Sequence, residues 1–225
     1  MTMTPNQVPL TAQEPLTTRI KICGVSTPEA IQVAAEAGAN GIGFVRAKGS
    51  SRYIDYEQAS ALLKHVPDGL TSVAVYVNAP LEEVMALKAN AIQLHGQEDE
   101  IMIESIKANM PETFVIRGFP FSRPHLNRWQ ETPGIHAVLV DGQSAGSGRG
   151  FDYEPLMNIR HTMTHPLIVA GGLTPDNVGD AITLLQPWAV DVSSGVESAP
   201  GVKDHGAIRA FCQAVREADQ IRTSN

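Results

Sequence analysis

Short apolar runs alternate with longer amphipathic stretches along this chain from residue 19 onward. The apolar runs are rich in β-branched residues, which is typical of buried parallel strands. The longer stretches carry apolar residues at i, i+3 and i+4, which predicts helices with one buried face. Strands are expected at residues 19–25, 41–45, 71–77, 91–95, 113–119, 136–141, 166–172 and 189–195, and helical periodicity is clear in residues 27–39, 56–66, 81–89 and 99–110.

Helix boundary residues support this alternation. Thr27-Pro28 and Thr174-Pro175 each place a hydroxyl cap before a first-turn proline, and Gly38 lies where a helix is expected to end. Eight strand and helix units in about 200 residues predict an α/β fold, the closed (β/α)8 TIM barrel with eight parallel strands. An open doubly wound sheet would rarely repeat so evenly.

The chain is expected to fold as one domain, because no linker, low-complexity segment or charge run interrupts the repeat. We assign residues 19–225 to a single TIM-barrel catalytic domain and residues 1–18 to a disordered polar tail. That tail lacks the basic start and apolar run of a secretory signal, and no stretch is apolar for long enough to span a membrane. Two cysteines cannot form a disulfide framework, which favours a cytoplasmic location.

The net charge of -7 argues against nucleic acid or an anionic membrane as a partner. A phosphate group would have to be held by a local site, so a small-molecule ligand is expected. TIM barrels build active sites at the carboxyl ends of the strands and in the loops that follow. The polar or glycine residues at those positions are Lys21, Cys23, Arg46, Arg52, Asn78, Gln93, His95, Arg117, Asp141, Gly171, Gly172, Asp191, Ser193, Ser194 and Gly195.

Cys23 is the first candidate for chemistry. Lys21 lies two residues earlier and therefore on the same face of the strand, where its ammonium would lower the thiol pKa and favour a general base. A buried cysteine that only fills space is the alternative. Asp191 would face Lys21 if the barrel closes, and a buried ion pair that stabilises the site explains both residues equally well.

Asp141 is the second candidate, because it ends an apolar strand. Partial desolvation favours the protonated carboxyl group that a general acid needs, whereas the alternative is a cap on the next turn. Gln93 and His95 share a face and are expected to point into the same site, where His95 either orients substrate or bonds within the rim. Arg52 is a candidate clamp for a carboxylate, although a loop arginine is commonly solvated. The expected substrate-binding residues are Lys21, Arg52, Gln93, His95 and Asp191.

Glycine-containing strand ends after the seventh and eighth strands suggest a phosphate site, because TIM barrels commonly bind phosphate there through backbone amides. Simple tight turns are the alternative. The proposed phosphate-binding residues are Gly171, Gly172, Ser193, Ser194 and Gly195, with Gly146, Ser147 and Gly148 of the loop after the sixth strand closing over the same group.

Two other patterns are set aside. His161 and His165 lack an adjacent glutamate and are followed by a proline, so they do not form a helical metal site. Cys212 lies in an amphipathic helix, where burial explains it. No metal and no cofactor are expected.

Together these segments resemble the phosphoribosylanthranilate isomerase family, from KICGVST through GVKDHGAIRAF. Cys23 lies in KICG, Arg52 in an S-x-R-Y-[IV] segment, His95 in QLHG and Asp141 before a G-S-G-x-x-F-D loop, and AGGLTPDNV and VDVSSGVE end the match. The resemblance implies that Cys23 is the general base and Asp141 the general acid, with Arg52 binding a carboxylate. A monomer or homodimer is expected.

The reaction that the resemblance implies is an Amadori rearrangement in tryptophan biosynthesis. It converts N-(5-phosphoribosyl)anthranilate to 1-(o-carboxyphenylamino)-1-deoxyribulose 5-phosphate without metal or cofactor. Residues 46–49 depart from the family, which usually has an aromatic-rich segment there. Another phosphosugar isomerase or lyase on the same barrel, or a catalytically silent barrel subunit, are the alternative functions.

Overall fold

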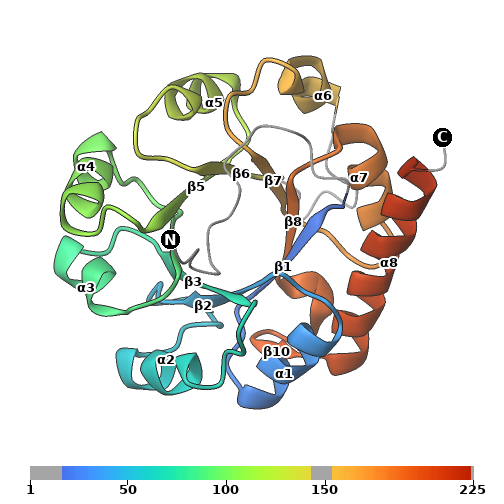
Figure 1. Cartoon of the computed structure of the whole chain (residues 1–225), viewed down its shortest axis with the longest axis horizontal. Helices are drawn as coiled ribbons and strands as arrows, with labels where there is room; N and C mark the ends of the chain where they lie inside the picture. The colour runs from blue at the N-terminus through green and yellow to red at the C-terminus, as the bar shows by residue number, and fades with distance from the viewer. Residues whose placement is uncertain (1–16, 143–153, 224–225) are drawn as a thin grey trace, which may run out of the picture.

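The computed structural model describes residues 17–142 and 154–223, which form a closed barrel of parallel strands surrounded by helices (Figure 1). The strands of the barrel are β1 (Arg19–Cys23), β2 (Gly41–Val45), β3 (Thr71–Tyr76), β4 (Ala91–Leu94), β5 (Phe114–Pro120), β6 (Ala137–Asp141), β7 (Leu167–Ala170) and β8 (Ala189–Val192). The helices are α1 (Pro28–Glu36), α2 (Tyr56–Leu63), α3 (Leu81–Ala86), α4 (Glu100–Asn109), α5 (Arg123–Gln130), α6 (Glu154–Arg160), α7 (Val178–Leu185) and α8 (His205–Thr223).

The (β/α)8 barrel predicted from the sequence is confirmed. Each strand pairs with the next, and β1 pairs with β8 to close the barrel. Several strands end earlier than predicted. The first ends at Cys23 because Gly24 adopts a φ of 76°, and the last ends at Val192, before a 3-10 turn at Ser194–Val196.

The helix boundaries were predicted correctly in one case and wrongly in another. Thr27 caps α1, accepting a hydrogen bond from the Ala30 N–H, and Gly38 follows the helix with a φ of 84°. Thr174, by contrast, does not cap α7, which begins only at Val178. Residues 175–177 form a turn, and Asn177 accepts the Thr174 N–H in that turn.

The core has an outer and an inner part. Ile, Leu and Val side chains pack between the strands and the helices, while smaller residues such as Val73, Ala137 and Ala189 fill the barrel interior. Aromatic residues close the amino-terminal end of the barrel. The Trp188 ring stacks on Phe114 with centroids 6.1 Å apart and lies 4.7 Å from the Arg19 guanidinium carbon. The opposite end, called the mouth below, is left for polar residues.

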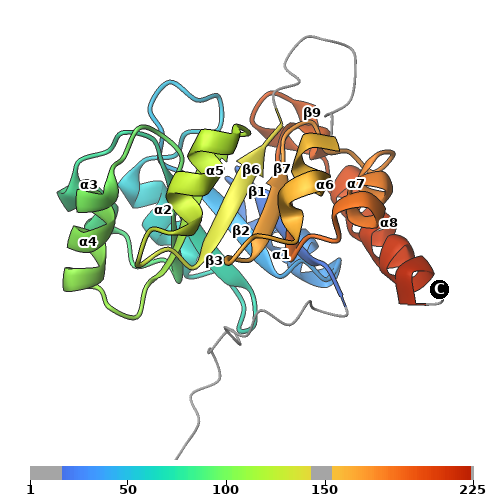
Figure 2. The ribbon, with the colours of Figure 1, turned by 90° about the horizontal axis from the view of Figure 1, so that it is seen from above.

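A short hairpin extends the mouth beyond β8. Its strands are β9 (Glu197–Ala199) and β10 (Val202–Lys203), which pair antiparallel. Figure 2 shows β9 past one end of the barrel strands. Gly201 in its turn packs on the loop after β2, where an added Cβ would lie 2.3 Å from the Ser51 carbonyl oxygen.

The ordered domain begins before Arg19. Thr18, which the sequence analysis assigned to the tail, is fully buried, and its N–H and hydroxyl both donate to the Asp219 carboxylate at 2.7 Å. Asp219 lies on α8, which packs between α1 and α7 beside β1 (Figure 1). The contact therefore fixes the start of β1 against the last helix.

Among the described residues, no helix combines the length and apolar character needed to cross a membrane.

Asp219→Ala tests this contact. The substitution leaves the buried N–H of Thr18 without its acceptor, so the free energy of unfolding should fall by about 2 kcal/mol. Urea denaturation followed by circular dichroism measures the change. Glu104→Ala, an exposed carboxylate on α4, is the control and should change little. Equal stability of the two variants would show that the contact does not hold the chain start.

Candidate active site

The mouth of the barrel brings together the two residues predicted to move protons. Cys23 lies at the carboxyl end of β1 and Asp141 at the carboxyl end of β6. Beneath Cys23, Lys21 forms the predicted buried ion pair with Asp191, and its Nζ lies 2.9 Å from both carboxylate oxygens. Burial opposes the charge on Lys21, but Asp191 and Cys23 together raise the pKa of Lys21, so its ammonium is retained.

The pKa of the Cys23 thiol differs from the expectation. Burial raises the thiol pKa above its usual value, because the side chain is only 8% exposed, and the Asp191 charge adds to the rise. Lys21 acts in the predicted direction and lowers the pKa, as does Lys203, but burial has the larger effect. The prediction of a net lowering of the Cys23 pKa was therefore wrong, because it counted the ammonium and not the desolvation.

Gly43 makes the room that Cys23 occupies. It pairs with Cys23 in the register between β1 and β2. A Cβ at Gly43 would lie 2.8 Å from the Cys23 Sγ and 3.2 Å from the Lys21 Nζ. Both distances are shorter than an ordinary van der Waals contact, so any side chain at this position would displace the thiol or the ammonium.

Gln93, His95 and Asp141 form a chain of contacts across the mouth. The Gln93 Nε2 lies 3.1 Å from the His95 Nδ1, and the His95 Nε2 lies 3.5 Å from an Asp141 oxygen. Gly118 makes room for the His95 ring, since a Cβ there would be 2.4 Å from Nδ1. The prediction that these three side chains share the mouth is confirmed. Desolvation of Asp141 is incomplete, because its side chain is 39% exposed.

The loops after β7 and β8 lie against each other at the mouth. Gly195 touches Leu173 so closely that an added Cβ would lie 1.9 Å from the Leu173 carbonyl oxygen. Gly171 and Gly172 adopt φ angles of 90° and 64°, which favour glycine, and a Cβ at Gly171 would strike the Asp141 carboxylate. Ser194 is exposed beside them. Gly146, Ser147 and Gly148 lie outside the described residues.

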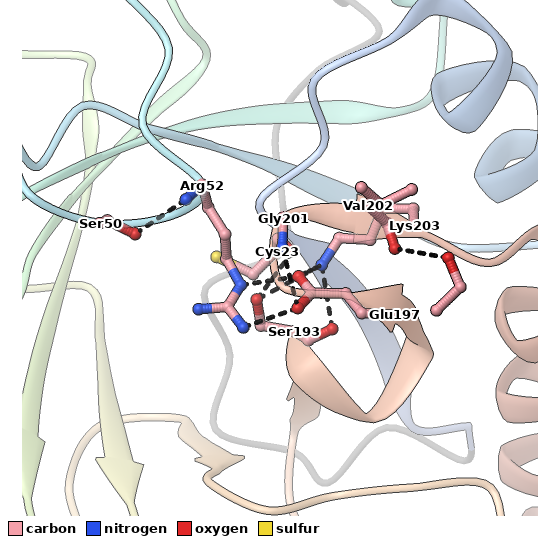
Figure 3. A network of polar contacts seen from close by, with 9 residues as sticks. Cys23, Ser50, Arg52, Ser193, Glu197, Gly201, Val202 and Lys203 are labelled. Carbon is pink, nitrogen blue, oxygen red and sulfur yellow. Dashed lines mark hydrogen bonds and ion pairs between the residues drawn. The ribbon is translucent and has the colours of Figure 1, made fainter.

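Arg52 reaches the mouth from the loop after β2, and its side chain is already bound on one edge (Figure 3). Its Nε and Nη2 donate to the two oxygens of Glu197, each at 2.7 Å. Lys203 donates to the same carboxylate at 2.7 Å and to the Ser193 carbonyl at 2.9 Å. The Ser193 hydroxyl in turn donates to the Cys23 carbonyl at 3.1 Å. Although burial opposes it, Arg52 and Lys203 hold the pKa of Glu197 below its usual value.

Two of the polar residues expected at the mouth face outward instead, away from the barrel interior. Arg46 is buried on the outer side of β2, where it binds Glu83 at 3.0 Å and the Ile54 carbonyl, while Ala47 packs against the barrel interior. Arg117 also faces outward, and its guanidinium lies 4.5 Å from the centroid of the Trp129 ring. Asn78 lies where it was expected, in the loop after β3, and accepts a hydrogen bond from the Gln97 N–H of the loop after β4.

Sequence reasoning missed Gly43, Glu197 and Lys203. Gly41 and Gly43 lie two residues apart on the interior face of β2 and leave only Val45 with a side chain on that face, a pattern that signals close approach of neighbouring residues. Glu197 and Lys203 flank a Pro-Gly turn just after the last strand. Their place in a hairpin at the mouth could therefore be predicted, although their hydrogen-bond partners could not.

Within residues 17–142 and 154–223, no group of three or more His, Cys, Asp or Glu side chains is arranged to hold a metal ion.

Comparison with known proteins extends this picture. Residues 20–214 match the family model described as N-(5'-phosphoribosyl)anthranilate isomerase. A relative of that name from Methylibium petroleiphilum is 38% identical over 90% of this chain and 95% of its own. A crystal structure of phosphoribosyl anthranilate isomerase from Thermotoga maritima superposes with a TM-score of 0.80 at 34% identity, covering 89% of this chain and all of the other.

A second solved structure carries a ligand in its description. It is phosphoribosyl anthranilate isomerase in complex with reduced 1-(o-carboxyphenylamino)-1-deoxyribulose 5-phosphate. The TM-score is 0.79 at 32% identity, and the match covers 89% of this chain and 100% of that one. All of these similarities span nearly the whole barrel rather than one motif.

Lys21→Met tests whether the ammonium acts on the thiol. Removing it should raise the pKa of Cys23 further, because Lys21 is the strongest charge that favours the thiolate. The measurement is the pH dependence of Cys23 alkylation by iodoacetamide, followed by mass spectrometry. Cys212, which burial gives a pKa of about 11, is the internal reference.

The double variant Lys21→Met/Asp191→Asn controls for the carboxylate left unpaired in the single variant. It should titrate closer to the unsubstituted protein, since the Asp191 charge itself raises the thiol pKa. An unchanged Cys23 titration in Lys21→Met would remove Lys21 from any activating role.

Proposed function

The chain belongs to the N-(5'-phosphoribosyl)anthranilate isomerase family, and we propose that Cys23 and Asp141 are the base and the acid of its reaction. The protein is an isomerase of tryptophan biosynthesis, converting N-(5-phosphoribosyl)anthranilate to 1-(o-carboxyphenylamino)-1-deoxyribulose 5-phosphate. The observation that carries the residue assignment is the position of one thiol and one carboxyl group at the same barrel mouth, each beside a charged or polar partner.

The reaction needs two proton transfers, which these groups supply. Protonated Asp141 gives its proton to the ribose ring oxygen, the bond from that oxygen to C1 breaks, and the nitrogen lone pair forms a C=N bond. The Cys23 thiolate then removes the proton from C2, and the C–H electrons form an enol-amine. Transfer of the enol proton to C1 yields the ketone, and exchange with solvent returns Cys23 and Asp141 to their starting states.

We assign the Gln93–His95 pair to orienting Asp141 and the substrate. If the Gln93 amide donates to the His95 Nδ1, the proton of the ring lies on Nε2, which faces the Asp141 carboxylate. A donor there stabilises the carboxylate that forms once the acid has given up its proton. Lys21 and Asp191 are 5% and 7% exposed, so we assign them to holding the base in place rather than to direct substrate contact.

The substrate's two anionic ends have separate sites in this proposal. Gly171, Gly172, Ser194 and Gly195 offer backbone amides for the phosphate, supported by the close packing of the loops after β7 and β8. The Ser193 hydroxyl is engaged with the Cys23 carbonyl, so we assign Ser193 a supporting role. Arg52 takes the carboxylate through the edge of its guanidinium that points away from Glu197 (Figure 3).

The remaining partner and location assignments stay predictions. We propose a cytoplasmic location and no binding to nucleic acid or membrane, on the basis of charge and cysteine content. We also propose a monomer or homodimer, since one solved relative is described as monomers of a dimeric phosphoribosylanthranilate isomerase from Thermotoga maritima. The alternatives of a different phosphosugar enzyme or a silent subunit are disfavoured by the family match over residues 20–214.

Cys23→Ala and Asp141→Asn test the two catalytic assignments. Each removes one proton transfer, so kcat/KM should fall by about 10²- to 10⁴-fold. Loss of anthranilate-type fluorescence with freshly made phosphoribosylanthranilate measures turnover. Cys212→Ala, which removes a buried thiol far along α8, is the control and should retain activity. Normal turnover in both Cys23→Ala and Asp141→Asn would contradict the mechanism.

Gly43→Ala tests whether room beside Cys23 is needed for its chemistry. The new methyl group would lie 2.8 Å from the Sγ, and a displacement of the base of this order should lower kcat about 10- to 100-fold. Gly41→Ala is a matched control on the same strand face, since its Cβ would meet nothing nearer than 3.4 Å. The same assay compares the two, and equal rates would show that the position of the thiol tolerates a methyl group.

A further inference from the structure

Glu197 is the centre of a polar cluster for which the proposed reaction gives no role. Its Oε1 accepts from the Arg52 Nε and the Lys203 Nζ, each at 2.7 Å. Its Oε2 accepts from the Arg52 Nη2 at 2.7 Å and from the Gly201 N–H at 3.3 Å. Four donors on one carboxylate fix its orientation, so Glu197 holds the Arg52 guanidinium in one position.

Of Arg52, Glu197 and Lys203, only Arg52 has a side chain exposed enough to touch a ligand. The side chains of Glu197 and Lys203 are 4% and 2% exposed, whereas that of Arg52 is 25% exposed. Only Arg52 reaches the mouth, as Figure 3 shows for the guanidinium nitrogen that points away from Glu197. Any effect of Glu197 or Lys203 on substrate therefore acts through another residue.

The cluster also connects parts of the site that are distant in sequence. Lys203 donates to the Ser193 carbonyl at 2.9 Å and lies 3.4 Å from its hydroxyl, and that hydroxyl binds the Cys23 carbonyl. Gly24, next to Cys23, packs against Arg52, because a Cβ there would be 2.6 Å from the Arg52 Cδ. One carboxylate and one ammonium thus hold Arg52, the Ser193 loop and the end of β1 in a fixed arrangement.

The charges in the cluster favour one more anion. Arg52 and Lys203 supply two positive charges and Glu197 supplies one negative charge, which leaves a net charge of about +1 beside the mouth. A ligand carboxylate on the outer edge of Arg52 would balance it. A partly exposed arginine samples many conformations, so a fixed partner on one edge lowers the entropy lost when the other edge binds.

Resting on the proposed function, we propose that Glu197 and Lys203 are positioning residues that orient Arg52 toward the substrate's carboxylate and hold it in register with the Ser193 loop. Glu197 does this directly, through two parallel hydrogen bonds. Lys203 does it by joining Glu197 to Ser193. The prediction is that preference for the carboxylate depends on Glu197 even though Glu197 never touches the ligand.

The test compares two ligands that differ only in that carboxylate. They are reduced 1-(o-carboxyphenylamino)-1-deoxyribulose 5-phosphate and the same compound made with aniline in place of anthranilate. Binding of each is measured by calorimetry to the unsubstituted protein, Arg52→Met, Glu197→Gln and the double variant. Glu197→Gln should reduce the affinity ratio of the two ligands about tenfold, with affinity for the aniline compound nearly unchanged.

The double variant should be no worse than Arg52→Met, because both substitutions act through one arginine. Glu100→Gln is the matched control, since Glu100 holds Arg128 through two bonds of 2.7 and 2.6 Å on an exposed surface. An unchanged affinity ratio in Glu197→Gln, with Arg52→Met losing the preference, would overturn this inference alone. No preference in the unsubstituted protein would instead count against the carboxylate site of the proposed function.

Lys203→Met is the second variant and keeps the proposal testable if Glu197→Gln fails to fold. It releases Glu197 from the Ser193 loop while leaving the Arg52 pair in place. The affinity ratio should fall about threefold, and KM should rise more than kcat falls. An unchanged ratio in Lys203→Met would show that the link to Ser193 has no part in orienting Arg52.

Discussion

The ion pair between Lys21 and Asp191 is the interaction on which the barrel and its site both depend. The two residues are paired in the register that joins the first strand to the last, and both are buried. Burial of two charges costs several kcal/mol unless their geometry compensates, and here the ammonium lies 2.9 Å from both carboxylate oxygens. Because Cys23 lies directly above Lys21, the contact that closes the barrel also sets the electrostatic field at the thiol.

Much of this arrangement follows from strand periodicity. The alternation of apolar runs with helical stretches was sufficient to predict the closed barrel, and the carboxyl end of each strand then located Cys23, His95 and Asp141 at one mouth. The same period-two rule also accounts for the errors. Arg117 alternates with Ile116 and Gly118, which face the interior, so Arg117 must face outward, but that parity is known only once the register is known.

Other features lie beyond what a single sequence can show. Arg52 and Glu197 are 145 residues apart, and nothing local to either one indicates its partner. The pKa of Cys23 depends on the balance between burial and several charges, which requires the packed structure and not only the neighbouring lysine. Sequence position therefore identified the chemical groups at the mouth, whereas their mutual orientation comes from loops that meet only in the folded chain.

The raised pKa of Cys23 is compatible with its role as a base, because the proposed reaction creates a positive charge on the substrate that favours the thiolate. When the ring opens, the nitrogen lone pair moves into the C=N bond and leaves positive charge next to the carbon whose proton is removed. A cation within a few ångströms of a buried thiol favours the thiolate, and the low polarity that disfavours thiolate in the free protein makes that effect stronger. Burial therefore raises the thiol pKa by itself, and it also increases the amount by which a positively charged intermediate lowers that pKa. The thiol is thus stabilised as thiolate by a charge that exists only during the reaction and, permanently, by the fixed ammonium of Lys21.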